Sequence, residues 1–106
     1  MEKIILKEYH NNKGQLHSID GPASIWSDGT KKWYINDKLH RIDGPAIEWA
    51  DGTKEWFCMG MLHRVDGPAR EYDDGEKEWW CMGKKDWLAT DKESIIMSNK
   101  YRERLI

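Results

Sequence analysis

The sequence predicts a mainly β fold, in which 23-residue β-hairpin repeats stack into a single-layer antiparallel meander that ends in a C-terminal capping α-helix. Three features recur at that period. The octapeptide LHSIDGPA begins at Leu16, and its variants LHRIDGPA and LHRVDGPA begin at Leu39 and Leu62. An Asp-Gly dipeptide and a later tryptophan recur at the same interval, as Asp28-Gly29, Asp51-Gly52 and Asp74-Gly75, and as Trp33, Trp56 and Trp79. Self-similarity at a fixed period of this order indicates a repeat architecture.

The extent of this self-similarity sets the domain organisation. Residues 39–61 and 62–84 are identical at 16 of 23 positions, and residues 16–38 match residues 39–61 at 13 positions. A chain of 106 residues is the size of one domain. We therefore expect a single repeat domain over residues 1–106, with about 3.5 hairpin repeats between residues 9 and 85.

Two turn signals divide each repeat into strands. In the second repeat, residues 47–49 and 53–58 flank Asp51-Gly52, and this arrangement predicts a two-residue type I′ turn with φ > 0 at both central positions. A second turn is expected at Met59-Gly60. Its equivalents in the chain are Lys13-Gly14, Asn36-Asp37 and Met82-Gly83. An extended Leu-His-Arg segment follows, and Asp-Gly-Pro ends it before the next strand, where proline's missing N–H is tolerated.

Alternation along these strands predicts which side chains share a face. With a two-residue Asp-Gly turn, Ile47, Trp49 and Trp56 lie on one face. Glu48 and Glu55 then lie on the opposite face. The same pattern continues in the neighbouring repeats at Trp26, Trp33, Tyr72 and Trp79. We expect this tryptophan ladder to form the core. A second aromatic row falls on the other face and is the better candidate for an exposed contact surface; it consists of Tyr34, Phe57 and Trp80.

The repeat pattern ends after Gly83, and a capping helix is predicted over about residues 90–105. Thr90 and Glu93 form a capping box, with Thr90 as the N-cap. Apolar residues then recur near helical spacing, at Ile96, Met97, Tyr101 and Leu105. Such a helix would cover the last apolar unit of the array, and a partner-binding helix is the alternative.

Composition argues against several functional classes. Charged residues make up 34% of the chain and the net charge is −2, whereas a dedicated nucleic-acid binder usually has a basic excess. No apolar run approaches the ~20 residues of a membrane span. The N-terminal sequence MEKIILKEYHNN carries acidic residues and lacks the cleavage site of a signal peptide. We therefore expect no membrane span and a cytoplasmic location, in the producing or the host cell.

The repeat resembles a known family. A hairpin with Gly after an aromatic strand and His three residues later, as in WFCMGMLH from Trp56 to His63, resembles the MORN repeat, especially its degenerate bacterial and phage variants. The resemblance covers roughly residues 9–85. It implies a single-layer sheet of stacked hairpins, used mainly as a protein-interaction scaffold and sometimes proposed to contact lipid. The family usually has Gly directly after the His, where this chain has Ser18, Arg41 and Arg64, and Gly within the aromatic strand, where it has Glu55 and Glu78.

The residues able to carry chemistry are spaced too widely to cooperate. The His-x-x-Asp unit, which recurs from His17, His40 and His63, is a metal or acid–base site or a hydrogen-bonded turn. Successive repeats are displaced by two strand spacings, near 10 Å, so their histidines cannot share one zinc with bonds of ~2.0–2.1 Å. The same displacement exceeds the roughly 4.4–6.8 Å Cα span of a disulfide between Cys58 and Cys81. We therefore favour the turn, reduced thiols, no metal, no cofactor and no enzymatic activity.

A repeated margin of cationic donors is the main surface candidate. His40, Arg41, His63 and Arg64 stand at a fixed offset from the tryptophans, and such donors bind carboxylates or phosphates. A solvated rim is the alternative. With the second aromatic row, the candidate binding surface comprises His40, Arg41, His63, Arg64, Tyr34, Phe57 and Trp80.

Two functions follow as hypotheses. The first is a non-enzymatic protein-interaction module, for example a small phage or bacterial inhibitor that masks a target protein; the phage setting comes only from the resemblance. The alternative is a binder of a phosphate-bearing ligand (nucleotide, nucleic acid or anionic lipid) through the Arg/His margin. Self-association is a further option, because residues 3–9 could form an exposed edge strand, which Lys3, Lys7 and Glu8 would disfavour.

Overall fold

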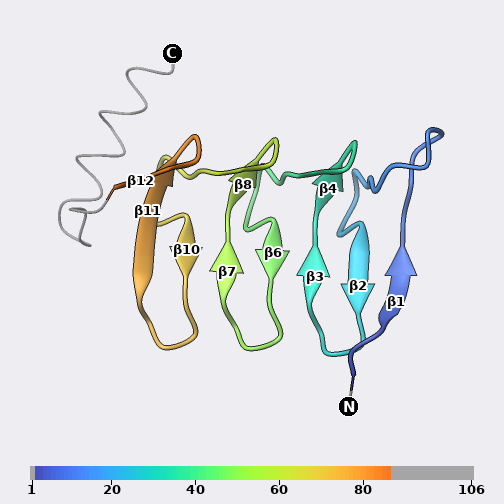
Figure 1. The fold of residues 1–106 in the computed structure, drawn as a ribbon, viewed down its shortest axis with the longest axis horizontal. Coiled ribbons are helices and arrows are strands. Elements are labelled where there is room, and N and C mark those ends of the chain that lie inside the picture. Colours follow the sequence, from blue (N-terminus) through green and yellow to red (C-terminus); the bar gives the residue numbers. More distant parts are fainter. Residues whose placement is uncertain (1, 87–106) are drawn as a thin grey trace.

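The computed structural model describes residues 2–86, and this part of the chain is mainly β with no helix (Figure 1). Its strands are β1 (Ile5–Glu8), β2 (Ser24–Trp26), β3 (Lys31–Lys32), β4 (Tyr34–Ile35), β5 (Lys38–Leu39), β6 (Ile47–Glu48), β7 (Lys54–Glu55), β8 (Phe57–Cys58), β9 (Met61–Leu62), β10 (Arg70–Glu71), β11 (Lys77–Cys81) and β12 (Lys84–Asp86). Eight of them form one antiparallel sheet in the order β1-β2-β3-β6-β7-β10-β11-β12. The pairs β4–β5 and β8–β9 form separate hairpins, so the large sheet is a meander, as predicted. The helix predicted at about 90–105 lies outside the described residues.

The Asp-Gly turns differ from the predicted two-residue type. Their glycines have φ of 93° to 98°, but the aspartates before them do not have positive φ. In the first turn, the Gly29 N–H donates to the Trp26 carbonyl at 3.0 Å, and the Trp26 N–H donates to the Thr30 carbonyl at 2.9 Å. These bonds enclose a three-residue loop, a type I turn followed by a G1 bulge. Asp28 Oδ1 accepts the Thr30 N–H at 2.9 Å and so supports the turn with its side chain. The prediction of a type I′ turn is wrong here.

The third loop residue shifts the strand register by one, and this shift moves side chains to opposite faces. Ile47 pairs with Glu55 across the hairpin, so these two side chains share a face with Trp49. Glu48 and Trp56, each one residue further along, lie on the other face. The prediction that Glu48 and Glu55 share a face is therefore wrong, and so is the single tryptophan ladder. One aromatic row comprises Trp26, Trp49 and Tyr72, and the other, on the opposite face, comprises Trp33, Trp56 and Trp79.

The second turn of each repeat is the two-residue turn that the sequence predicts, at three of four places. Both central residues have positive φ at Asn36-Asp37, Met59-Gly60 and Met82-Gly83. At Lys13-Gly14 only the glycine does, and Asn11 and Gln15 enclose another three-residue loop. Methionine rarely adopts the φ of 48° found at Met59, a conformation that costs a non-glycine residue about 1–2 kcal/mol.

Small side chains form the buried core. The alanines of Asp-Gly-Pro-Ala, which are Ala23, Ala46 and Ala69, are all 0% exposed. The Ala46 N–H donates to the Glu55 carbonyl and its own carbonyl accepts the Trp33 N–H, both at 2.8 Å, so this residue joins the strands on either side of it. A small side chain suits a position enclosed from both sides. The other buried residues are Ser24, Thr30, Ile47, Thr53 and Trp79.

The tryptophans are mostly half-buried. Of those within residues 2–86, only Trp79 is buried, so the prediction that the tryptophans form the core is wrong. Cationic side chains lie over several of the rings instead. Lys32 Nζ lies 5.6 Å from the ring centre of Trp26 and 4.9 Å from that of Trp49, within the range of cation–π attraction.

Strand β1 forms one edge of the large sheet and is exposed along its length. Its apolar side chains Ile5 and Leu6 are 44% and 62% exposed. A register irregularity between Ile5 and Lys7 interrupts its pairing with β2. Irregular edges with charged residues resist further strand pairing. Within the described residues, no helix has the length and hydropathy needed to cross a membrane.

Candidate functional site

Three equivalent loops lie at the end of the sheet opposite the Asp-Gly turns (Figure 1). These rim loops comprise residues 17–21, 40–44 and 63–67, and each carries the His-x-x-Asp-Gly unit. Arg41 and Arg64, the cations predicted to face a partner, lie back against the sheet. The Cζ of Arg41 is 3.9 Å from the ring centre of Trp33, and that of Arg64 is 4.0 Å from the ring centre of Trp56. A planar guanidinium stacks well on an aromatic face.

The two guanidinium groups are also bonded to groups of their own repeats. Arg41 Nε donates to Asp43 Oδ1 at 3.1 Å, while Nη1 donates to the Pro45 carbonyl and to Glu48 Oε2, each at 3.0 Å. Arg64 repeats this pattern at 3.1 Å with Asp66, Pro68 and Glu71. Each positive charge is thus held between two carboxylates. Through these contacts, the two arginine side chains help to hold their own rim loops in shape.

The glycine of Asp-Gly-Pro makes room for the arginine. A Cβ on Gly44 would lie 2.9 Å from Arg41 Cζ, and one on Gly67 would lie 2.9 Å from Arg64 Cζ. The equivalent Gly21 has nothing within 4 Å of such a Cβ, because Ser18 stands where the other loops have arginine. The close approach of the guanidinium therefore accounts for glycine in the second and third loops.

The histidines of the rim loops hold the next two-residue turn along the chain. His40 Nδ1 accepts the Met59 N–H at 3.0 Å, and the Leu39 carbonyl accepts the Gly60 N–H at 2.8 Å. The same pair of bonds recurs in the other two repeats. His17 Nδ1 accepts the Asn36 N–H, and the Leu16 carbonyl accepts the Asp37 N–H. His63 Nδ1 accepts the Met82 N–H, and the Leu62 carbonyl accepts the Gly83 N–H. Each Leu-His dipeptide thus binds both amides of a type I′ turn. An accepting Nδ1 is unprotonated, so the proton of the neutral ring is assigned to Nε2.

The environment of His63 favours this neutral state, because burial lowers the pKa of its imidazole. The His-x-x-Asp unit does not act as a pair, since His40 faces the next turn while Asp43 faces Arg41. The turn interpretation therefore fits better than an acid–base site. Within this turn, the aspartates of the second and third loops, Asp43 and Asp66, accept from the arginine side chains.

The most exposed large apolar side chains of the described residues lie between these histidines and aspartates. Ile42 is 92% exposed and Ile19 is 83% exposed; Val65 is their half-buried equivalent. Neither isoleucine was predicted as a site residue, because both lie outside the strands whose alternation indicated the exposed positions. The sequence did contain a signal for them, since an aliphatic residue stands at the fourth position of every LHxxDGPA segment, and this segment has no buried face.

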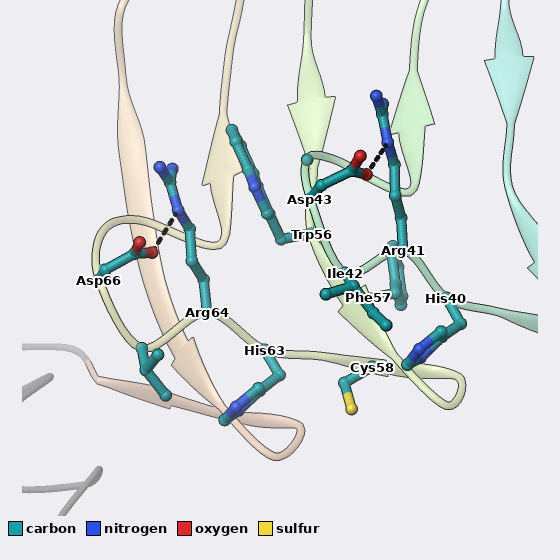
Figure 2. Close-up of a pocket in the computed structure, with 12 residues that line it drawn as sticks. His40, Arg41, Ile42, Asp43, Trp56, Phe57, Cys58, His63, Arg64 and Asp66 are labelled. Atoms are coloured by element: carbon teal, nitrogen blue, oxygen red, sulfur yellow. Dashed lines mark hydrogen bonds and ion pairs between the residues drawn. The ribbon is translucent and has the colours of Figure 1, made fainter. Parts of the chain in front are cut away.

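Two grooves separate the three rim loops. The groove between the second and third loops has a volume of about 610 Å³ and is lined by Trp56, Phe57 and Cys58 together with loop residues (Figure 2). The groove between the first and second loops has a volume of about 580 Å³ and is lined by Trp33 and Ile35 in the same way. His40, Arg41, Ile42 and Asp43 line both grooves. The second rim loop is therefore a ridge with a groove on each side, and each groove is lined by both apolar and polar side chains.

The three residues of the predicted second aromatic row, Tyr34, Phe57 and Trp80, are all half-buried. Phe57 lines a groove together with His40, Arg41, His63 and Arg64, so five of the seven predicted site residues come together. Tyr34 is half-buried in β4, and burial raises the pKa of its hydroxyl.

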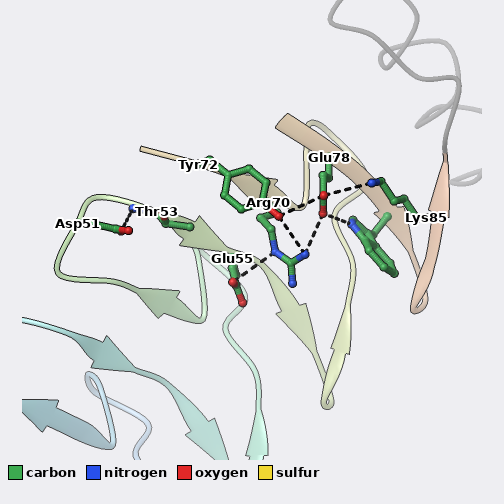
Figure 3. Close-up of polar contacts among 8 residues, drawn as sticks. Asp51, Thr53, Glu55, Arg70, Tyr72, Glu78 and Lys85 are labelled. Atoms are coloured by element: carbon green, nitrogen blue, oxygen red, sulfur yellow. Dashed lines mark hydrogen bonds and ion pairs between the residues drawn. The ribbon is translucent and has the colours of Figure 1, made fainter. Parts of the chain in front are cut away.

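Trp80 belongs to a polar network around Glu78. Figure 3 shows Glu78 with its partners Arg70, Tyr72 and Lys85. Trp80 Nε1 donates to Glu78 Oε1 at 3.0 Å, and Arg70 Nη1 donates to the same oxygen at 2.8 Å. The Tyr72 hydroxyl and Lys85 Nζ donate to the other oxygen, each at 3.1 Å. Burial raises the pKa of Glu78, but these donors outweigh it and the pKa is lowered overall. The network joins β10, β11 and β12. It explains the position of Trp80 by contacts within the chain, with no need for a second protein.

The described residues include two cysteines. Cys58 and Cys81 are free thiols, and burial raises the pKa of Cys81, which disfavours the reactive thiolate. No group of three or more His, Cys, Asp or Glu side chains in residues 2–86 is placed to hold a metal ion. What the site offers is shape, apolar surface and exposed carboxylates.

Comparison with known proteins adds no assignment. No family model, no curated protein and no solved structure matches the chain.

Proposed function

We propose that this chain is a non-enzymatic protein-interaction module that binds its partner across the rim loops and the two grooves between them. The observation that carries the proposal is the exposure of Ile42 and Ile19, at 92% and 83%, beside grooves lined by aromatic and aliphatic residues. Exposed apolar surface with a polar rim is typical of a protein-binding site. Full burial of one such side chain in a complex contributes about 1.5–3 kcal/mol.

The alternative, a phosphate-bearing ligand, fits the rim loops less well. Bidentate recognition of phosphate by an arginine needs guanidinium donors that can turn toward the ligand. Arg41 and Arg64 are each bonded by two carboxylates and a backbone carbonyl, and each is stacked on a tryptophan. Freeing either guanidinium would break several bonds of its own loop.

Three finer assignments are parts of this proposal. The chain is a MORN-like array of stacked 23-residue repeats in one layer, supported by the equivalent turn, histidine and arginine bonds described above. Its role is to mask a target protein, in a bacterial or phage setting that rests on the resemblance alone. It works in the cytoplasm, which agrees with its free cysteines.

The test is capture of a partner by the immobilised chain from a lysate of its source cell, followed by mass spectrometry. Ile42→Asp removes the central apolar contact, and Leu6→Asp on the exposed edge strand is the matched control, since both side chains are largely exposed. We expect one defined protein to bind the wild type and Leu6→Asp and to be lost from Ile42→Asp, with equal melting temperatures for all three.

Other outcomes would contradict the proposal. Loss of the partner only with Leu6→Asp would place binding at the β1 edge, and a change of oligomeric state with that variant would indicate self-association. Salt-sensitive binding of a nucleotide or oligonucleotide, unaffected by Ile42→Asp, would favour the phosphate ligand. Turnover of a substrate by the purified chain would exclude a purely binding role.

A further inference from the structure

The spacing of the two grooves limits what can occupy them together. Each groove lies beside the second rim loop, and successive repeats each add two strands to the large sheet. Neighbouring strands are about 4.7–4.9 Å apart, so equivalent points of successive repeats, including the two grooves, are separated by roughly 9.6 Å. A partner element that fills both grooves must present two side chains on one face at this separation.

An α-helix meets this requirement and a β-strand does not. Residues i and i+7 of a helix lie on the same face, and at a rise of 1.5 Å per residue they are about 10.5 Å apart. Same-face residues of a strand are about 6.6 Å or about 13 Å apart, because alternate residues point to opposite sides. A helix laid along the row of rim loops therefore places one apolar side chain in each groove.

Ile42 restricts the helix between these two side chains. The side chain is 92% exposed and stands on the ridge that separates the grooves. The partner residues at i+3 and i+4 pass over this ridge, so small residues are required there. The resulting pattern is a large apolar residue, a small pair in the middle, and a second large apolar residue seven positions after the first.

The charge exposed along the rim loops is negative. The Asp43 and Asp66 side chains are 85% and 68% exposed, whereas the Arg41 and Arg64 side chains that they bond are 22% and 24% exposed. Asp20 is also exposed, and the first loop has Ser18 where the others have arginine. A partner therefore meets carboxylates on the outside and guanidinium groups only beneath them. Lysine and arginine beside the apolar stripe of the helix complement this surface.

We propose, on the basis of the proposed function, that the partner binds through a basic amphipathic helix. Its apolar side chains at i and i+7 enter the grooves on either side of Ile42, small residues at i+3 and i+4 cross the ridge, and flanking Lys or Arg side chains pair with Asp20, Asp43 and Asp66.

The probe is a display library of randomised peptides with no imposed secondary structure, panned against the full-length chain alone; the enriched peptides are then measured against Ile42→Asp. We expect the enriched peptides to carry the i, i+7 apolar pair, small residues between them and an excess of Lys and Arg. Ile42→Asp should weaken a selected peptide roughly tenfold or more, the loss expected when one buried aliphatic contact is removed. Asp20→Asn should weaken it severalfold at low salt and less at high salt. Asp73→Asn, on the Asp-Gly turns at the opposite end of the sheet, should have no effect.

Enrichment of acidic, proline-rich or non-helical peptides would overturn the helix inference. So would selected peptides that bind Ile42→Asp as tightly as the wild type. The two proposals fail separately. An Ile42-dependent partner that binds through a strand or an acidic segment overturns only the helix inference and leaves the proposed function standing. A captured partner and selected peptides that are both insensitive to Ile42→Asp overturn both proposals.

Discussion

Substitution of Gly44 by alanine tests whether the arginine stack dictates the glycine of the rim loop. The added Cβ would lie 2.9 Å from Arg41 Cζ and 3.1 Å from its Nε and Nη1, closer than the roughly 3.4 Å at which ordinary contacts begin. The guanidinium must therefore withdraw by about half an ångström from this position. Because three hydrogen bonds of 3.0–3.1 Å and the Trp33 ring hold it there, the withdrawal strains all of these contacts.

The magnitude follows from these contacts. A partly exposed cation–π stack contributes about 0.5–1 kcal/mol, and exposed ion pairs contribute about 0.2–1 kcal/mol each, so losing most of them costs about 1–2 kcal/mol. Replacing glycine also restricts the unfolded chain, which stabilises the fold by about 0.4–1 kcal/mol. The matched variant Gly21→Ala has that gain without the clash, since its Cβ meets nothing within 4 Å. We expect Gly44→Ala to be less stable than Gly21→Ala by about 1–2 kcal/mol, or roughly 4–16 °C in melting temperature.

Urea and thermal unfolding of both variants measure this difference. A double-mutant cycle separates the clash from other effects of the alanine, because Gly44→Ala should cost nothing once Arg41 is replaced by alanine. Equal stabilities of Gly44→Ala and Gly21→Ala would refute the reasoning. So would a cost for Gly44→Ala that persists in the Arg41→Ala background.

Three further predictions concern the turns and the polar network. Burial lowers the pKa of His63 in the folded chain, so below about pH 6.5 this residue binds more protons in the unfolded chain than in the folded one. Its contribution to stability is therefore present above that pH and is lost as the pH falls through the folded pKa. Urea unfolding across this range should show a shallower pH dependence for His63→Asn, whose Oδ1 accepts the same amide without titrating, and a pH dependence equal to that of the wild type would contradict this role of the histidine. Glu78→Gln should lower the free energy of unfolding by about 1–3 kcal/mol because it removes the negative charge to which the partly buried Arg70 and Lys85 donate; the exposed Glu76→Gln should change it by less than about 0.5 kcal/mol, and equal losses would contradict the network. Met59→Asn should raise the melting temperature, since asparagine tolerates φ of 48° better than methionine; a decrease would mean that contacts of the methionine side chain outweigh the backbone strain.

The turns show how far local sequence reaches. Met59-Gly60 specifies a type I′ turn because glycine adopts positive φ freely and the flanking strands need that twist. Asp-Gly is compatible with two solutions, and the side chain of Asp28 favours the longer one by accepting the amide two residues ahead. One additional loop residue then decided the faces of Trp49 and Trp56. The faces were predicted wrongly because one ambiguous turn preceded them.

The candidate site was predicted in part for a similar reason. Arg41, Arg64, His40, His63 and Phe57 do gather at the rim, because the repeat period places equivalent loops side by side. Whether a cation points to solvent or lies on a ring depends on the neighbouring strand, and no local pattern contains that information. The exposure of Ile42 likewise follows from the position of its loop at the end of the sheet.

By itself the sequence determined the repeat period, the mainly β class and the meander, because these depend on turn chemistry and on self-similarity along the chain. Only the tertiary structure decided that the alanines form the core together with Ile47 and one tryptophan, Trp79. It also decided that the arginines stack, that the histidines hold the next turn, and that an aliphatic residue occupies the ridge between two grooves. Each of these outcomes depends on a contact between residues that are distant in sequence, such as Trp33 with Arg41 or His40 with Met59. Such contacts form only once the strand register is set, and a single loop residue sets that register.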